Sequence, residues 1–150
     1  MNQDIEAIFL DVGNTLRIVL EEPDFQQNAM QELMRLVGAR EPQNEFFAKL
    51  EERWKKYRKE SKTSLIEAPE EQLWTKYLLP DYPAEKIAPL HGVLTRLWRD
   101  RDGRRVPRAD ARETILELDR RGYLLGIIAN TITETEIPDW MEADGVTNYF

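Results

Sequence analysis

The chain has 150 residues, of which 41% are hydrophobic and 33% are charged, a composition typical of globular rather than disordered proteins. Its formal net charge of -7 gives it no general attraction for the phosphate backbone of nucleic acids. It has no cysteine and a single histidine, which excludes disulfides, cysteine nucleophiles and metal sites built from several histidines.

Two further features concern localisation. The opening residues MNQDIEA carry acid where a secretory signal carries positive charge. No apolar run approaches the roughly 20 residues that a membrane-spanning helix needs. We therefore expect a cytoplasmic protein that has no membrane partner and no nucleic-acid partner.

The first predicted element is a strand over residues 5–10. Its four consecutive apolar residues, Ala7 to Leu10, suit a strand that is covered on both faces, as in a parallel sheet. The strand is followed at once by Asp11-Val12-Gly13-Asn14-Thr15, a sequence typical of a loop. An aspartate at the carboxyl end of a parallel strand lies where open α/β sheets bind their ligands.

The long middle segment, residues 18–105, is predicted to be helical throughout. Apolar residues recur at helical spacing over residues 25–37, 44–59, 70–79 and 83–101. In the second of these helices Trp54 and Tyr57 are three residues apart, which indicates a packed face rather than a nucleic-acid surface. We expect His91, in the last of them, to be a surface or packing residue.

The last part of the chain predicts a helix over residues 108–121 and a second strand over 123–129. Arg120-Arg121-Gly122 is typical of a helix end, and the strand is followed by Asn130 and Thr131. A helix leading into an apolar strand is the repeating unit of an α/β fold with a parallel sheet. We predict an α/β core made of residues 1–17 and 106–150, interrupted by a helical module at 18–105.

These patterns place candidate site residues at two strand ends. The Asp11 carboxylate can act as a nucleophile, and Thr15 can hold it in place by a hydrogen bond. Gly13 leaves room for a substrate, Asn14 tolerates a left-handed backbone, and the N–H groups of both can face an anion. Asn130 and Thr131 can donate to the same ligand. An ordinary turn after the first strand, and a helix cap at Asn130 and Thr131, are the alternatives.

Two runs resemble motifs of the haloacid-dehalogenase-like (HAD) hydrolases. FLDVGNTL, residues 9–16, is similar to the first motif of that superfamily, and LLGIIANT, residues 124–131, is similar to the second. The helical segment between them resembles the C1 cap of many members, and DGVTNYF, residues 144–150, resembles the segment before their third strand. The resemblance spans the chain and implies a HAD-like Rossmannoid sheet with an inserted helical cap.

The resemblance also implies roles for individual residues. Asp11 matches the nucleophile, which in phosphatases of the family also binds Mg²⁺, and Gly13 matches a position whose backbone carbonyl is a second metal ligand. Thr15 matches the end of the first motif and is expected to be catalytic. The expected substrate-binding residues are Asn14, Asn130 and Thr131.

The sequence departs from the family pattern at several points. Gly13 stands where phosphatases carry an aspartate as general acid, whose loss typically costs about 10²–10⁴-fold in rate. Ala129 stands where the second motif has a phosphate-binding Ser or Thr. The third-motif lysine and the fourth-motif acids have no counterpart, and those acids complete the family's Mg²⁺ site.

Three functions are compatible with these observations. The first is a Mg²⁺-dependent phosphatase that acts on a small phosphorylated metabolite through an aspartyl-phosphate on Asp11. The second is a 2-haloacid dehalogenase, which needs neither a metal nor an acid at Gly13 because a halide leaves without a proton. The third is a non-catalytic HAD-like binding module. For both enzyme functions the expected substrate is a small anion. An open sheet edge would favour pairing with a second copy of the chain, so a homo-oligomer is also possible.

Overall fold

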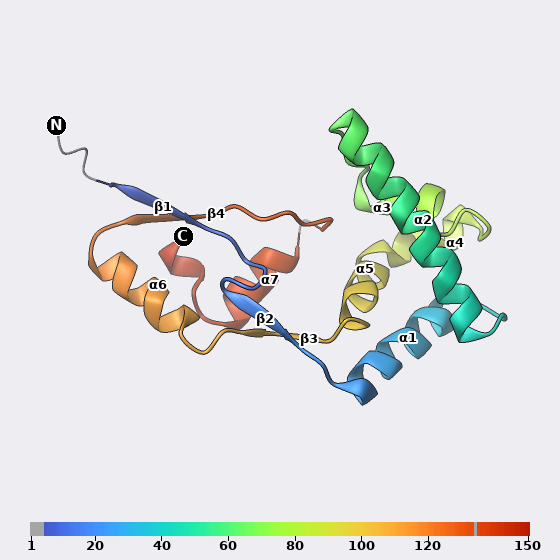
Figure 1. The fold of residues 1–150 in the computed structure, drawn as a ribbon, viewed down its shortest axis with the longest axis horizontal. Helices are drawn as coiled ribbons and strands as arrows, with labels where there is room; N and C mark the ends of the chain where they lie inside the picture. Colours follow the sequence, from blue (N-terminus) through green and yellow to red (C-terminus); the bar gives the residue numbers. More distant parts are fainter. Residues whose placement is uncertain (1–4, 134) are drawn as a thin grey trace. The chain divides into compact units, whose positions relative to one another are not determined.

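The computed structural model describes residues 5–133 and 135–150, so the first four residues of the predicted core segment lie outside it. The chain forms two compact units. We call Met1–Leu20 together with Arg104–Phe150 the core unit, and Glu21–Gly103 the helical unit. The elements are labelled in Figure 1.

The core unit contains two small sheets. β1 (Ala7–Leu10) pairs with β4 (Leu124–Ile127) in parallel, with Ala7 opposite Leu124 and Leu10 opposite Ile127. β2 (Arg17–Leu20) pairs with β3 (Arg104–Pro107) in antiparallel fashion. The remaining elements are α6 (Ala111–Arg120), α7 (Glu136–Ala143) and the short 3₁₀ helix η3 (Thr147–Tyr149). The fold is therefore mixed α/β, as predicted.

The β2–β3 pair corrects the sequence interpretation, which placed no strand between residues 18 and 105. β2 leads into the helical unit and β3 leads out of it, with Leu20 opposite Arg104. Both strands have only four residues. Pro107 ends β3. Proline has no N–H to donate to a ladder, and it is tolerated here because β3 is an edge strand.

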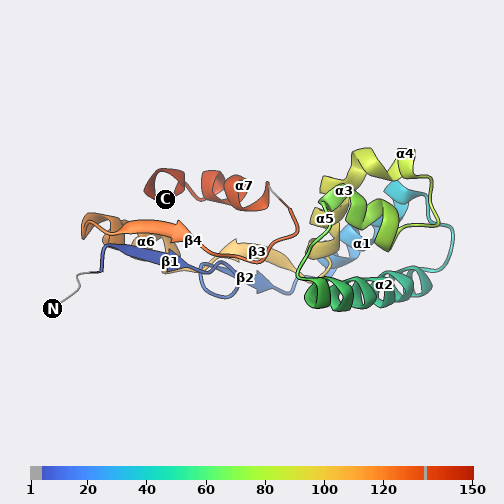
Figure 2. The ribbon, with the colours of Figure 1, turned by 90° about the horizontal axis from the view of Figure 1, so that it is seen from above.

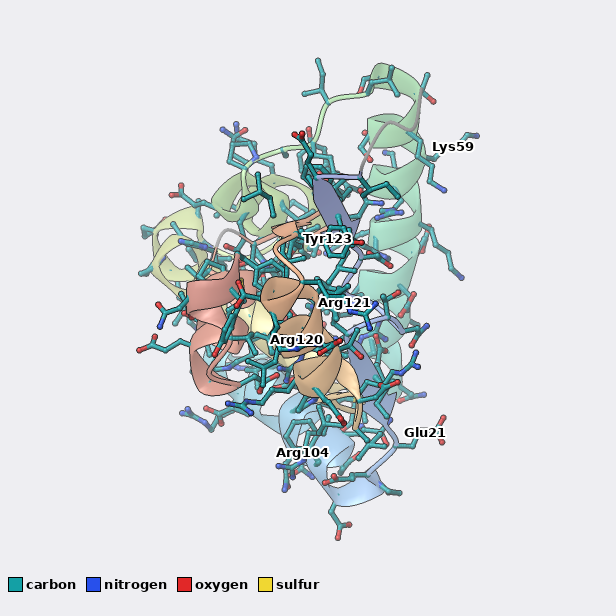
Figure 3. The ribbon with its side chains drawn as sticks, turned by 90° about the vertical axis from the view of Figure 1, so that its left-hand side faces the viewer. Glu21, Lys59, Arg104, Arg120, Arg121 and Tyr123 are labelled. Carbon is teal, nitrogen blue, oxygen red and sulfur yellow. The ribbon has the colours of Figure 1, made fainter. Side chains whose placement is uncertain are left out.

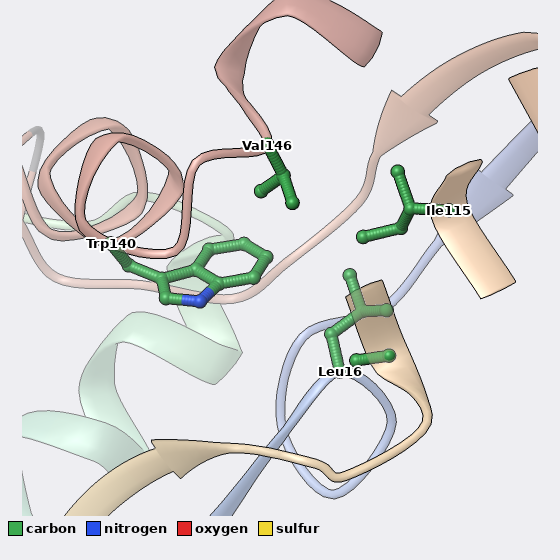
Figure 4. Close-up of a cluster of buried hydrophobic side chains, with 5 residues drawn as sticks. Leu16, Ile115, Trp140 and Val146 are labelled. Carbon is green, nitrogen blue, oxygen red and sulfur yellow. The ribbon is translucent and has the colours of Figure 1, made fainter. Parts of the chain in front are cut away.

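Both helices of the core unit pack on one face of the β1–β4 sheet. Leu16, Ile115, Trp140 and Val146 form the centre of this cluster (Figure 4). Leu10, Leu125 and Ile127 of the two strands pack against it. On the other face Phe9 is 64% exposed and Leu124 is 71% exposed. Among the described residues the sheet is thus covered on one face only, and the prediction of a strand buried on both faces was wrong.

The end of α6 follows the prediction. Gly122 has a φ of 85°, the left-handed conformation that commonly ends a helix at glycine. The Arg120 and Arg121 side chains extend from this end of the helix (Figure 3), and both donate to the Glu117 carboxylate.

The helical unit is built from α1 (Pro23–Val37), α2 (Gln43–Ser64) and a series of shorter helices. These are α3 (Glu70–Gln72), the π-helix η1 (Leu73–Leu78), α4 (Ala84–Ile87), the 3₁₀ helix η2 (Ala88–Leu90) and α5 (His91–Asp100). Figure 2 shows α2 and the shorter helices from a second side. The single helix expected over 83–101 is broken at Pro89, because proline removes a backbone donor and crowds the preceding turn.

Aromatic side chains dominate the interior of the helical unit. Trp74 is fully buried, and its indole Nε1 donates to the Thr95 hydroxyl over 2.7 Å. Trp98 is in ring contact with Phe47, Trp54 and Trp74. Trp54 stacks on Tyr57 with 5.8 Å between the ring centroids, which confirms the packed face predicted for these two residues. None of the helices in the described ranges is both long enough and apolar enough to cross a bilayer.

Candidate functional site

The predicted nucleophile lies at the carboxyl end of the parallel sheet. Asp11 directly follows β1, and its side chain is exposed. The parallel ladder runs up to this point, because the Ile128 N–H donates to the Leu10 carbonyl over 3.0 Å. The polar residues that follow β1 and those that follow β4 therefore leave the sheet at the same edge. Within the described residues the Asp11 carboxylate has no hydrogen-bond or ion-pair partner, so it is available to a ligand.

The segment after Asp11 closes into a tight turn, residues 12–17, which we call the Asp11 turn. The Val12 carbonyl accepts hydrogen bonds from the N–H groups of Thr15, Leu16 and Arg17, at 3.0–3.2 Å. Asn14 has a φ of 58°, which is the left-handed conformation expected from its sequence. Its N–H donates to the Arg17 carbonyl over 2.8 Å.

These hydrogen bonds determine which backbone groups of the Asp11 turn are free to bind a ligand. The Asn14 N–H is committed to Arg17, contrary to the expectation that it would face an anion. The N–H and carbonyl of Gly13 take no part in the bonds that close the turn. A Cβ added at Gly13 would meet nothing within 4 Å, so position 13 borders open space.

The other predicted site residues are placed at this edge but are not joined into one cluster. Thr15 and Asn130 are exposed, and across residues 5–133 and 135–150 neither side chain has a hydrogen-bond partner. The Thr131 hydroxyl is engaged within its own loop, where it donates to the Thr133 carbonyl and accepts from the Thr133 N–H, both over 3.3 Å. The alternative role as a helix cap is not seen, because α7 begins at Glu136 with Thr135 at its N-cap.

Sequence reasoning missed Arg17, which holds the Asp11 turn to the rest of the core unit. Its guanidinium donates to Asp144 over 2.8 Å and to the Arg105 carbonyl over 2.7 Å. It also lies 5.4 Å from the centre of the Trp140 ring, and the Trp140 Nε1 donates to Asp144 as well. Burial lowers the pKa of Arg17, while the charge of Asp144 acts in the opposite direction. No local pattern connects Arg17 with a partner 127 residues away.

The metal that the family resemblance implies can be tested against the donor set. Among the described residues there is no group of three or more Asp, Glu or His side chains that could hold a metal ion. Beside the Asp11 turn lies the Asp11 carboxylate, and within it the Gly13 carbonyl takes no part in the bonds that close the turn. Mg²⁺ demands near-octahedral coordination by oxygen atoms. The described residues do not make a Mg²⁺ site by themselves.

Comparison with known proteins leaves the family open. No model of a protein family matches the sequence, and no curated protein matches it significantly. A relationship to HAD-like hydrolases is therefore a proposal that depends on the resemblance of the FLDVGNTL and LLGIIANT runs and of the segments described with them. It has to be tested through the chemistry of Asp11.

Proposed function

We propose that this chain is a HAD-like hydrolase in which Asp11 is the catalytic nucleophile and the helical unit corresponds to the cap. One observation carries the proposal: an exposed carboxylate without a partner follows β1, where the parallel ladder with β4 ends. Carboxylates of this kind form covalent intermediates that divide a difficult hydrolysis into two easier steps. We propose a HAD-like Rossmannoid arrangement for the sheet on the same basis.

The first candidate substrate class is a small phosphate monoester. An Asp11 oxygen attacks phosphorus, the bond from phosphorus to the alcohol oxygen breaks, and the alkoxide takes a proton from water because Gly13 has no acid to offer. Water then attacks the phosphorus of the aspartyl-phosphate, which releases inorganic phosphate and restores the carboxylate. Asn14 and Asn130 are proposed to bind the substrate, and Thr15 to assist Asp11. Mg²⁺, the cofactor of phosphatases in this family, would require ligands beyond the residues described.

A second candidate, a haloacid dehalogenase, is favoured by the donor set around Asp11. In that reaction the carboxylate attacks carbon and the halide leaves as an anion, so neither a metal nor a proton donor is needed. Water then attacks the carbonyl carbon of the Asp11 ester, which releases the alcohol. Asp11 supplies the carboxylate for the first step, and the glycine at position 13 leaves space beside it for the substrate.

The two reactions leave isotopic oxygen in different places. We would incubate the chain with p-nitrophenyl phosphate or with chloropropionate in water enriched in heavy oxygen, with and without Mg²⁺. For the phosphatase, the label enters inorganic phosphate, because water attacks phosphorus. For the dehalogenase, the label enters the carboxylate of the peptide that contains Asp11, because water attacks the aspartyl carbon. Mass spectrometry of the digested protein and of the released phosphate distinguishes them.

Asp11→Asn is the decisive variant, since an amide is a poor nucleophile. We expect turnover of either substrate to fall by at least about a thousandfold. Gly13→Asp adds a carboxyl group where there is space for it, and we expect it to raise phosphatase turnover without changing dehalogenation. Turnover that survives in Asp11→Asn would refute the proposal, and the absence of turnover on both substrates would favour the non-catalytic module.

A further inference from the structure

The helical unit contains a cavity that the proposed reaction does not use. It lies between the C-terminal half of α2, the connecting residues 65–69 and the η1 helix, and its volume is about 460 Å³. Small-molecule sites commonly measure about 300–1,000 Å³. Tyr57, Glu60 and Ser61 line it from α2, Ile66 and Glu67 line it from the connection, and Tyr77 lines it from η1.

Two tyrosine rings form an aromatic corner of this cavity. The rings of Tyr57 and Tyr77 are 5.0 Å apart and inclined at 58° to each other. Tyr57 is held firmly, because it is buried, stacks on Trp54, and accepts a hydrogen bond from the Ala68 N–H over 3.0 Å. Tyr77 is 37% exposed, so a ligand can reach its ring. Because Tyr57 is only 3% exposed, the Tyr77 ring is the π-surface that a ligand in the cavity can contact.

The charge of the lining is entirely negative. Glu60 and Glu67 are its charged residues, and no Lys, Arg or His belongs to the described lining. The negative charge of Glu67 also reaches the Tyr57 phenol, whose pKa is raised first by burial and then by this carboxylate. Arg58 lies 5.6 Å from the centre of the Trp54 ring and is outside the lining. The cavity therefore disfavours anions and favours a cation.

We propose that this cavity binds a small organic ammonium ion, with its positive group against the exposed ring of Tyr77 and its charge balanced by Glu60 and Glu67. Aromatic rings attract quaternary ammonium groups through their quadrupole, and one ring contributes modestly when the site is open to water. The apolar side chain of Ile66 would contact the hydrocarbon part of the ligand. This proposal is independent of the chemistry at Asp11.

The test compares choline with dimethylbutanol, its uncharged isostere, on the full chain. Binding is followed through the NMR signals of the tyrosine rings and by calorimetry. We expect choline to shift the signals of Tyr57 and Tyr77 and to bind about tenfold more tightly than dimethylbutanol. Equal affinity for the two compounds, or no binding of choline, would overturn the proposal.

Two variants examine the two parts of the cavity. Glu67→Gln removes a charge and Tyr77→Leu removes a ring, and we expect each to weaken choline binding by about three- to tenfold. Glu71→Gln is the matched control, because Glu71 is exposed, lies close in sequence and does not line the cavity. If Tyr77→Leu does not fold, Glu60→Gln with Glu67→Gln still decides the question. Choline affinity that is unchanged in this double variant would refute the assigned role of the carboxylates.

Discussion

The ion pair between Arg17 and Asp144 provides the sharpest test of how the core unit is held together. The two side chains are only 17% and 15% exposed, and Asp144 also accepts from the indole of Trp140. Asp144→Ala leaves a partly buried guanidinium without its counter-charge and an indole N–H without its acceptor. Removing one partner of a buried pair costs about 3–5 kcal/mol, and partial exposure reduces this. Including the lost indole bond, we expect a loss of about 2–4 kcal/mol.

The assay must report on the core unit alone. Trp140 lies in the core unit, whereas the tryptophans at 54, 74 and 98 lie in the helical unit. Fluorotryptophan labelling therefore gives a Trp140 resonance whose disappearance in urea follows unfolding of this unit. Glu117→Gln is the control, because it disrupts an exposed pair in the same unit. A loss in Asp144→Ala no larger than in this control would refute the reasoning, since it would show that water screens the Arg17–Asp144 pair.

Two further predictions concern one exposed and one buried interaction. The pKa of Glu117 lies at about 2 instead of its ordinary 4.5, because Arg120 and then Arg121 donate to its carboxylate. Its contribution to the stability of α6 is therefore present above the ordinary pKa and lost as the pH falls through about 2. A carboxyl NMR titration should show this midpoint, and the double variant Arg120→Gln, Arg121→Gln should return it toward 4.5. In the helical unit, Thr95→Val leaves the buried Trp74 indole unsatisfied and should lower the free energy of unfolding by about 1–3 kcal/mol, measured by urea titration followed by tryptophan fluorescence. Thr95→Ser retains the hydroxyl and should restore most of this loss, and an effect of Thr95→Val below about 0.5 kcal/mol would contradict the assigned bond.

Periodicity predicted the long helices well because each buries a continuous apolar face. Leu33 and Val37 of α1, and Phe46 and Leu50 of α2, are buried at the spacing that their positions imply. Periodicity did not separate α4, η2 and α5, although Pro89 indicated a break. The π-helix over Leu73–Leu78 has no sequence pattern that distinguishes it from an α-helix.

The strands of the β2–β3 pair were missed because each is short and one is rich in arginine. The Ile18-Val19-Leu20 run is a strand signal that could have identified β2. β3 carries Arg104 and Arg105, and a four-residue strand of this composition is defined by its partner rather than by its own residues. The pairing of two segments this far apart in the sequence cannot be predicted from the residues of either segment alone.

The candidate site was predictable in position but not in detail. The polar residues after the first strand predicted the place of Asp11, and Asn14 has the left-handed backbone that its residue type favours. The internal bonds of the turn and the engagement of the Thr131 hydroxyl are local, but residue type alone does not specify them. The anchoring of Arg17 depends on a contact between distant segments. The roles of Asp11, Thr15 and Gly13 in a reaction remain predictions.

The pairing of β2 with β3 has a consequence for how such a chain can change. Leu20 and Arg104 are opposite each other in the ladder, so the helical unit occupies the place of a hairpin loop. The two ends of an inserted domain are then held at neighbouring positions, whatever the length of the domain. The entropic cost of closing the loop increases only slowly with its length. The helical unit could be exchanged for another domain, or replaced by a two-residue turn, without altering the strands that flank it. Its interior can therefore diverge independently of the residues around Asp11.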